Sequence, residues 1–131
     1  MLRHPIQAQS VELEVAVRRT VVLLVEDEPL IAGLFKDALT DLGYEVIWAD
    51  SVEVGLGVLA EQRVDVAILD VQLGADYSYP IADVLHRAGI PFMFVSGVSR
   101  GSVPPEHQTR PFLPKPFRIM EVHRSLCALA G

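Results

Sequence analysis

Residues 21–28 read VVLLVEDE, a run of five apolar residues followed at once by Glu26, Asp27 and Glu28. Residues 64–70, VDVAILD, repeat this pattern, because an apolar run broken only by Asp65 ends in Asp70. Continuous apolar runs of this length are typical of buried parallel strands. In an open parallel sheet, sites form outside the carboxyl ends of the strands. We therefore expect the two groups of acids to meet there, although they lie far apart in the sequence.

The rest of the chain alternates between strand-like and helix-like segments. Strands are expected at 20–26, 44–49, 64–70, 91–96 and 112–113, and helices at 29–42, 52–62, 80–88 and 117–130. In the first helix the predicted core-facing stripe is Ile31, Leu34, Ala38 and Leu42. Short connections between alternating elements favour an α/β fold with a doubly wound, five-stranded parallel sheet of flavodoxin-like order 2-1-3-4-5. That order places the first and third strands side by side.

Two segments depart from this alternation. Residues 97–111 contain Gly97, Gly101 and three prolines, so we expect a mobile loop or one short turn, a degenerate fourth helix. Residues 1–19 precede the alternating unit at 20–131 and show strand-like alternation at 11–17. This N-terminal extension is interpreted as either an extra edge strand or a loose tail.

Composition excludes several classes of protein. A length of 131 residues suits one domain, and a net charge of −6 argues against nucleic-acid binding. No apolar run is long enough to span a membrane, the N-terminus lacks a secretory signal, and the lone Cys127 suits a reducing cytoplasm. We expect a cytoplasmic monomer or weak homodimer. The histidines lack metal-ligand spacing and are interpreted as ordinary surface or helix residues: His4, His86, His107 and His123.

Four groups are predicted to meet at the carboxyl ends of the strands: the pair Glu26 and Asp27, then Asp70, Ser96 and Lys115. Clustered carboxylates repel one another unless a cation or a proton joins them, and a hard divalent cation prefers oxygen ligands. Together the groups supply a nucleophile, a cation site, a hydroxyl and a positive charge. Those parts meet the needs of phosphoryl transfer, namely positioning and charge neutralisation.

Four stretches carry a resemblance to a known family: VVLLVEDEPLI at 21–31, DVAILDVQLG at 65–74, PFMFVSG at 91–97 and PFLPKPF at 111–117. In this order they resemble the response-regulator receiver domain of two-component signalling. The chain also resembles a single-domain receiver subgroup, frequent in alphaproteobacteria, that carries Pro-Phe-x-Phe-x-Thr-Gly after the fourth strand and has a degenerate fourth helix.

The resemblance implies a role for each site residue. Asp70 would be the phosphoacceptor. Mg²⁺ would be held by Asp27 directly, by Glu26 mainly through water, by Asp70, and by the backbone carbonyl of Gln72. Ser96 and Lys115 would contact phosphoryl oxygens, and the Lys115-Pro116 peptide bond would be cis.

Departures from the family pattern affect switching. The aromatic switch position is Phe112, which has no hydroxyl group, and Val98 stands where the subgroup often has an aromatic residue. Gln72 and Val98 would tune autodephosphorylation by controlling the access of water, and an apolar Val98 would shield the phosphoryl group.

The implied function is a phosphoprotein of a phosphorelay rather than an enzyme. No output domain follows the receiver in this sequence, so we expect a stand-alone response regulator that acts through protein–protein interaction or phosphate shuttling. Its donor would be a histidine kinase or a histidine phosphotransfer protein, and its downstream protein stays open. The alternative is a receiver-like interaction module that phosphorylation does not switch. An aspartyl-phosphate phosphatase is disfavoured because Gln72 stands where such enzymes have an acid.

Overall fold

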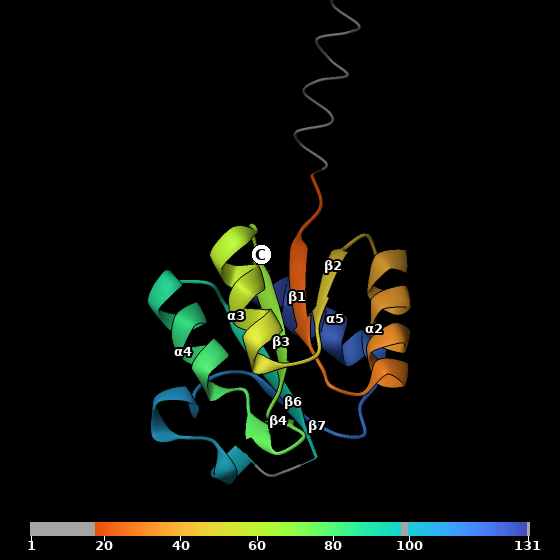
Figure 1. Ribbon diagram of the computed structural model, residues 1–131. Helices are drawn as coiled ribbons and strands as arrows, with labels where there is room; N and C mark the ends of the chain where they lie inside the picture. The colour runs from red at the N-terminus through yellow and green to blue at the C-terminus, as the bar shows by residue number, and fades with distance from the viewer. Residues whose placement is uncertain (1–17, 98–99, 131) are drawn as a thin grey trace, which may run out of the picture.

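The computed structural model describes residues 18–97 and 100–130, so the predictions for residues 1–17 and for Val98 lie outside the described residues. A five-stranded parallel sheet has the order β2-β1-β3-β6-β7 (Figure 1). Its strands are β1 (Val21–Val25), β2 (Glu45–Ala49), β3 (Val66–Asp70), β6 (Phe92–Ser96) and β7 (Phe112–Pro114). The predicted α/β class and the predicted strand order 2-1-3-4-5 are therefore confirmed.

Four α-helices cover the two faces of the sheet: α2 (Pro29–Asp41), α3 (Val52–Glu61), α4 (Tyr79–Ala88) and α5 (Ile119–Ala130). Helices α3 and α4 lie on one face, and α2 and α5 lie on the other (Figure 1). Ser51 caps the N-terminus of α3, because its Oγ accepts a hydrogen bond from the Val54 backbone N–H at 3.2 Å. No helix among the described residues is long and apolar enough to cross a membrane.

The buried face of α2 differs from the prediction. Its buried residues are Ala32, Phe35 and Leu39, whereas Leu34 is 65% exposed. Two apolar series of helical spacing overlap in this helix, and the sequence does not show which one faces the sheet. Phe35 decides between them, because its ring packs against Phe117 at 5.3 Å between centroids and buries more area than Leu34 could. The predicted stripe is therefore wrong by about a quarter turn.

Between β6 and β7, residues 100–111 contain two short 3₁₀ turns, η1 (Arg100–Ser102) and η2 (Pro105–His107). They stand where the sequence pattern would place the helix that follows the fourth strand. The predicted degenerate helix is confirmed. The segment is nevertheless held in place at several points. Tyr79 on α4 donates its hydroxyl hydrogen to the Ser102 carbonyl oxygen at 3.2 Å. The Arg100 guanidinium donates to the carbonyl oxygens of Gln108 and Arg110 at 3.0 and 2.8 Å.

His107, predicted to be an ordinary surface or helix residue, is buried within the 3₁₀ turn η2. It is 2% exposed, and its Nε2 lies 2.8 Å from the Asp83 Oδ1 of α4. Its ring packs edge-on against Phe92 and Phe94 of β6. A histidine in a Pro-rich segment gives no sign of burial in the sequence, because the partners that bury it come from α4 and β6.

Another element was not predicted. Residues 72–77 form a small antiparallel hairpin from β4 (Gln72–Leu73) and β5 (Asp76–Tyr77) directly after β3. Gly74 turns the chain at a φ of +61°, a conformation that favours glycine. Only Val71 separates the end of β3 from the start of the hairpin, so the hairpin lies next to the carboxyl end of β3.

The two glycines of α3 give a matched test of helix packing. A Cβ at Gly55 would lie 2.6 Å from Ile81 Cδ1 of α4, whereas a Cβ at Gly57 would meet nothing within 4 Å. Gly57→Ala should raise the free energy of unfolding by about 0.5–1 kcal/mol through helix propensity. Gly55→Ala should lose that gain to overpacking against buried Ile81. Urea unfolding of both variants checks this, and equal stabilisation would contradict the close α3–α4 contact.

Candidate functional site

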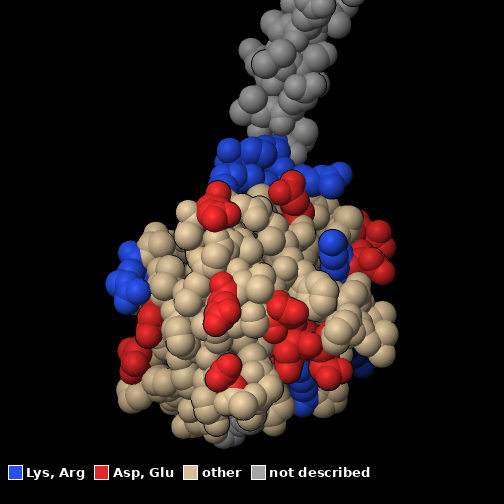
Figure 2. Space-filling view, in the orientation of Figure 1, with Lys and Arg blue, Asp and Glu red and all other residues tan. Residues whose placement is uncertain are grey.

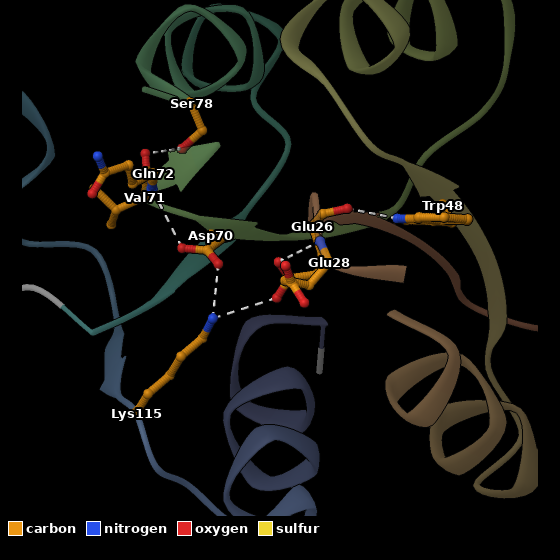
Figure 3. Close-up of polar contacts among 8 residues, drawn as sticks. All are labelled: Glu26, Glu28, Trp48, Asp70, Val71, Gln72, Ser78 and Lys115. Atoms are coloured by element: carbon orange, nitrogen blue, oxygen red, sulfur yellow. Dashed lines mark hydrogen bonds and ion pairs between the residues drawn. The ribbon is translucent and has the colours of Figure 1, made fainter. Parts of the chain in front are cut away.

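The site lies at the carboxyl ends of four neighbouring strands. Glu26 and Asp27 directly follow β1, and Asp70 is the last residue of β3. Ser96 is the last residue of β6 and Lys115 follows β7. Because β1, β3, β6 and β7 are consecutive in the sheet, their ends meet at one edge. Figure 3 shows Lys115 pointing from the β7 end toward the acids of β1 and β3. The expected convergence is thus present.

Lys115 joins two of the acids. Its Nζ lies 2.8 Å from Asp70 Oδ2 and 3.4 Å from Glu26 Oε1 (Figure 3). The backbone of Lys115 is fixed as well, since its N–H donates to the Ser96 carbonyl oxygen at 2.7 Å. The Lys115-Pro116 peptide bond is cis, as expected. The lysine is therefore held at both ends, by the sheet and by the carboxylates.

The three acids are close enough to share one ion. Glu26, Asp27 and Asp70 each offer a carboxylate oxygen, and these oxygens lie within 4.8 Å of one another. Glu26 and Asp70 are buried and Asp27 is half-buried. One ammonium group against three carboxyl groups leaves excess negative charge when all are ionised. An all-oxygen set of this kind is the donor set that Mg²⁺ accepts.

The pKa values of Glu26 and Lys115 reflect burial together with these neighbouring charges. Burial of the Glu26 carboxyl, together with the charge of Asp70, raises its pKa from 4.5 to about 7, against the lowering effects of the Glu28 backbone N–H and Lys115. Burial of Lys115 lowers its pKa, but the hydrogen bond to Asp70 and the charges of Asp70 and Glu26 outweigh burial and raise it. The ammonium therefore stays charged, while Glu26 accepts a proton near neutral pH.

The hairpin holds the other side of Asp70. The backbone N–H of Gln72 donates to Asp70 Oδ1 at 3.3 Å, so the two carboxylate oxygens have different partners. Ser78 fixes the residue between them, because its backbone N–H donates to the Val71 carbonyl oxygen at 2.9 Å. A Cβ at Gly74 would lie 3.9 Å from Asp27 Oδ2, which places the hairpin turn beside the second acid. Gln72 itself is exposed at this edge.

Two further predicted residues lie on the neighbouring strands β6 and β7. Ser96 is buried at the end of β6, and Phe112 is half-buried on β7. The Arg100 guanidinium carbon lies 5.3 Å from the centre of the Phe112 ring. Val98 lies outside the described residues. The structure thus brings Glu26, Asp27, Asp70 and Lys115 together directly.

One contact to the cluster was not predicted. Trp48 on β2 donates its indole Nε1–H to the Glu26 backbone carbonyl oxygen at 2.7 Å (Figure 3). Trp48 lies on the edge strand of the sheet. This hydrogen bond to Glu26 depends on the pairing of β1 with β2, so no local sequence motif indicates it.

The opposite end of the molecule carries a different charge. Lys and Arg side chains gather where the chain enters β1, as the top of Figure 2 shows. Arg18 and Arg19 lie at that entry, beside Asp65. Asp65 accepts a hydrogen bond from the Val21 N–H at 2.7 Å and pairs with Arg63 at 2.5 Å. This end anchors the start of β1, far from the acids at its other end.

Comparisons with known proteins identify the family and agree with the fold. The model of the family described as "Response regulator receiver domain" matches residues 22–126. The solution structure of SdrG from Sphingomonas melonis Fr1 is 41% identical, covers 85% of this chain and 96% of that chain, and has a TM-score of 0.73. TrrA from Thermotoga maritima, solved "in complex with Mg(2+)-BeF", has a TM-score of 0.74 over 84% of this chain and 98% of that chain. At 22% identity the TrrA match shows the shared fold.

Two curated relatives match over a shorter span. The "Uncharacterized transcriptional regulatory protein YbdJ" of Bacillus subtilis is 37% identical over 78 residues, 57% of this chain and 34% of that protein. The "Transcriptional activator protein IrlR" of Burkholderia pseudomallei is 30% identical over 76 residues, 57% of this chain and 33% of that protein. The match thus spans about a third of the length of these relatives.

The raised pKa of Glu26 predicts a pH-dependent stability. Between pH 4.5 and about 7 the folded protein binds a proton at Glu26 that the unfolded chain does not. Without divalent cations, the free energy of unfolding should therefore fall by roughly 1–3 kcal/mol as the pH rises through this window. Glu26→Gln should remove this part of the slope. Urea unfolding at several pH values in a chelator, with exposed Glu28→Gln as control, measures it. A slope unchanged by Glu26→Gln would contradict the assignment.

The acid cluster also predicts that Mg²⁺ binding depends on Asp27. Asp27→Ala should weaken Mg²⁺ binding by about tenfold or more, because it removes one of three clustered oxygen ligands. The same change should stabilise the cation-free protein by relieving repulsion. Calorimetric titration and urea unfolding measure the two effects. The control is Asp50→Ala, an exposed acid just after β2. Equal Mg²⁺ affinities for Asp27→Ala and wild type would rule out this site.

Proposed function

The chain belongs to the response regulator receiver domain family, and we propose that it accepts a phosphoryl group on Asp70. Receiver domains are signalling phosphoacceptors rather than classical enzymes, and they interact with histidine kinases or phosphotransfer proteins. The observation that carries the assignment is the contact of Lys115 Nζ with both Asp70 and Glu26, at 2.8 and 3.4 Å. The Lys115 ammonium thus lies beside the Asp70 carboxylate at the end of β3, and the acids Glu26 and Asp27 lie next to it.

In the proposed reaction, a carboxylate oxygen of Asp70 attacks the phosphorus of a phosphohistidine. The new O–P bond forms as the P–N bond breaks, and the leaving imidazole nitrogen takes the electron pair. Lys115 then exchanges its contact with Asp70 Oδ2 for one with a phosphoryl oxygen. The Gln72 N–H, which now reaches Asp70 Oδ1 at 3.3 Å, is a second donor beside the new group. The Ser96 hydroxyl is proposed as the third.

Receiver domains bind Mg²⁺ at their acidic pocket, and the oxygen donors here fit that ion. We propose that Asp27, Asp70 and the Gln72 carbonyl hold it directly and that Glu26 holds it mainly through water. The ion would supply charge neutralisation at the phosphoryl oxygens. Glu26 must give up its proton for this role, so its raised pKa makes cation binding compete with protonation near pH 7.

Signalling is proposed to pass from Ser96 and Phe112 to the neighbouring segment 100–111. Phe112 lies under the Arg100 guanidinium, and Arg100 also holds the Gln108 carbonyl oxygen. A shift of Phe112 would therefore disturb contacts inside this segment. Its outer surface is the proposed reading face for a partner protein, whether the receiver acts by direct interaction or as a phosphate shuttle. Gln72 and Val98 are proposed to set the rate of autodephosphorylation.

Two finer assignments have partial support. The PFMFVSG stretch supports the proposed membership of the Pro-Phe-x-Phe-x-Thr-Gly subgroup. The family match at 22–126 supports a receiver unit at 20–131 with residues 1–19 as an extension. A receiver-like module that phosphorylation does not switch is the alternative. It is disfavoured because Asp27, Asp70 and Lys115 are all present and in place.

Asp70 should be the sole phosphoacceptor. Incubation with Mg²⁺ and acetyl phosphate should add about 80 Da to the wild-type chain, and Asp70→Asn should abolish this adduct because the amide oxygen is a poor nucleophile. Intact mass spectrometry reads the result. Asp76→Asn, an exposed acid in the adjacent hairpin, is the matched control and should keep the adduct. An adduct that persists on Asp70→Asn would place the acceptor elsewhere.

A further inference from the structure

Trp48 contacts the acid cluster from outside it. It lies on the edge strand β2, and its indole Nε1–H reaches the Glu26 carbonyl oxygen at 2.7 Å (Figure 3). The side chain is 38% exposed, which is high for a tryptophan. Burial of apolar surface alone therefore gives an incomplete account of its place. The hydrogen bond is the specific contribution of this residue.

The hydrogen bond from the Trp48 indole takes the place of a sheet hydrogen bond to the Glu26 carbonyl group, which lies beyond the end of β1. Strand β1 ends at Val25, whose register partner in β2 is Ala49. One residue later, the Glu26 N–H still donates to the Ala49 carbonyl oxygen at 3.1 Å. Glu26 is 1% exposed, and a buried carbonyl group needs a donor. The Trp48 indole supplies it, so β2 holds both polar groups of the Glu26 backbone.

This hold extends to Asp27. The Glu26 carbonyl and the Asp27 N–H belong to one planar peptide unit, so fixing the direction of the carbonyl fixes the plane from which Asp27 leaves. The Glu26 side chain is held as well, because its Cα lies between the backbone N–H and the carbonyl group, both of which are hydrogen-bonded to β2. A single indole thus constrains two of the three clustered carboxyl groups without touching any of them.

We propose that Trp48 is a positioning residue for the divalent cation of this pocket, acting through the Glu26–Asp27 peptide unit. The proposal rests on the proposed function, because it assumes that the three acids bind Mg²⁺. Without the indole, the carboxyl groups of Asp27 and Glu26 sample orientations that do not point toward one shared site. Mg²⁺ then binds only the fraction of molecules in which they do, so its apparent affinity falls. By linkage, Mg²⁺ strengthens the Trp48–Glu26 contact by the same factor by which that contact strengthens Mg²⁺ binding.

Removing the N–H group tests the proposal. Trp48→Phe keeps an aromatic ring and removes the donor. It should weaken Mg²⁺ binding about three- to tenfold, the effect of one ordinary hydrogen bond. At saturating Mg²⁺, its rate of phosphorylation by acetyl phosphate should stay within about twofold of wild type, since Asp70 and Lys115 are untouched. Amide chemical shifts during a Mg²⁺ titration give the affinity.

Two controls separate positioning from general stability. Ile47→Val removes a methylene group from the same strand, at a position paired with Leu23; it should lower stability and leave Mg²⁺ affinity at the wild-type value. Replacing the Trp48 indole by benzothiophene removes the N–H at nearly constant shape and should match Trp48→Phe. Replacing it by 7-azaindole keeps the N–H and should restore wild-type affinity.

The outcomes separate the two claims. Wild-type Mg²⁺ affinity in Trp48→Phe, or an equal loss in Ile47→Val, would overturn the positioning role and leave the phosphoacceptor assignment intact. Absence of both Mg²⁺ binding and phosphoryl uptake in the wild type would overturn the proposed function, and the role of Trp48 with it. Weaker binding in Trp48→Phe and benzothiophene, restored by 7-azaindole, supports the proposal.

Discussion

The ammonium of Lys115 between Asp70 and Glu26 is the interaction on which the site depends. Strands β1 and β3 deliver carboxyl groups to one edge of the sheet, and their mutual repulsion would be costly without a compensating charge. Lys115 offsets part of it through contacts of 2.8 and 3.4 Å. Burial of the Glu26 carboxyl, together with the charge of Asp70, still raises the pKa of Glu26 to about 7. The site is therefore poised to take up a cation or a proton, and the proposed phosphoryl transfer would use the cation.

The sheet makes this arrangement possible because its backbone fixes the groups that carry the charge. The Lys115 N–H is bonded to Ser96 of β6, and the Glu26 N–H to Ala49 of β2. The short hairpin after β3 fixes Asp70 from the other side through Gln72. Strands buried on both faces hold these backbone positions rigidly, since α3 and α4 cover one face and α2 and α5 the other. Binding groups placed on such rigid elements lose little conformational entropy on use.

Much of this could be predicted from the sequence because it depends on local signals. Apolar runs that end in acids indicate strands and the edge at which they meet, and alternation of strands and helices gives the order of the sheet. Features that depend on partners distant in the sequence could not be predicted. The packing of Phe35 against Phe117 decides which side of α2 is buried, and α4 and β6 bury His107. The indole bond of Trp48 requires the pairing of β1 with β2, and only the assembled sheet reveals it.

The central proposal is that Asp70 accepts the phosphoryl group and that Lys115 changes partner when Asp70 is occupied. A crystal structure of the protein with Mg²⁺ and beryllium fluoride tests both parts at once. The expected result is beryllium fluoride on a carboxylate oxygen of Asp70, Lys115 Nζ on a fluorine atom, and the cation within ligating distance of Asp27 and Asp70. Beryllium fluoride bound elsewhere, or Lys115 still 2.8 Å from Asp70 Oδ2 beside a loaded acceptor, would contradict it.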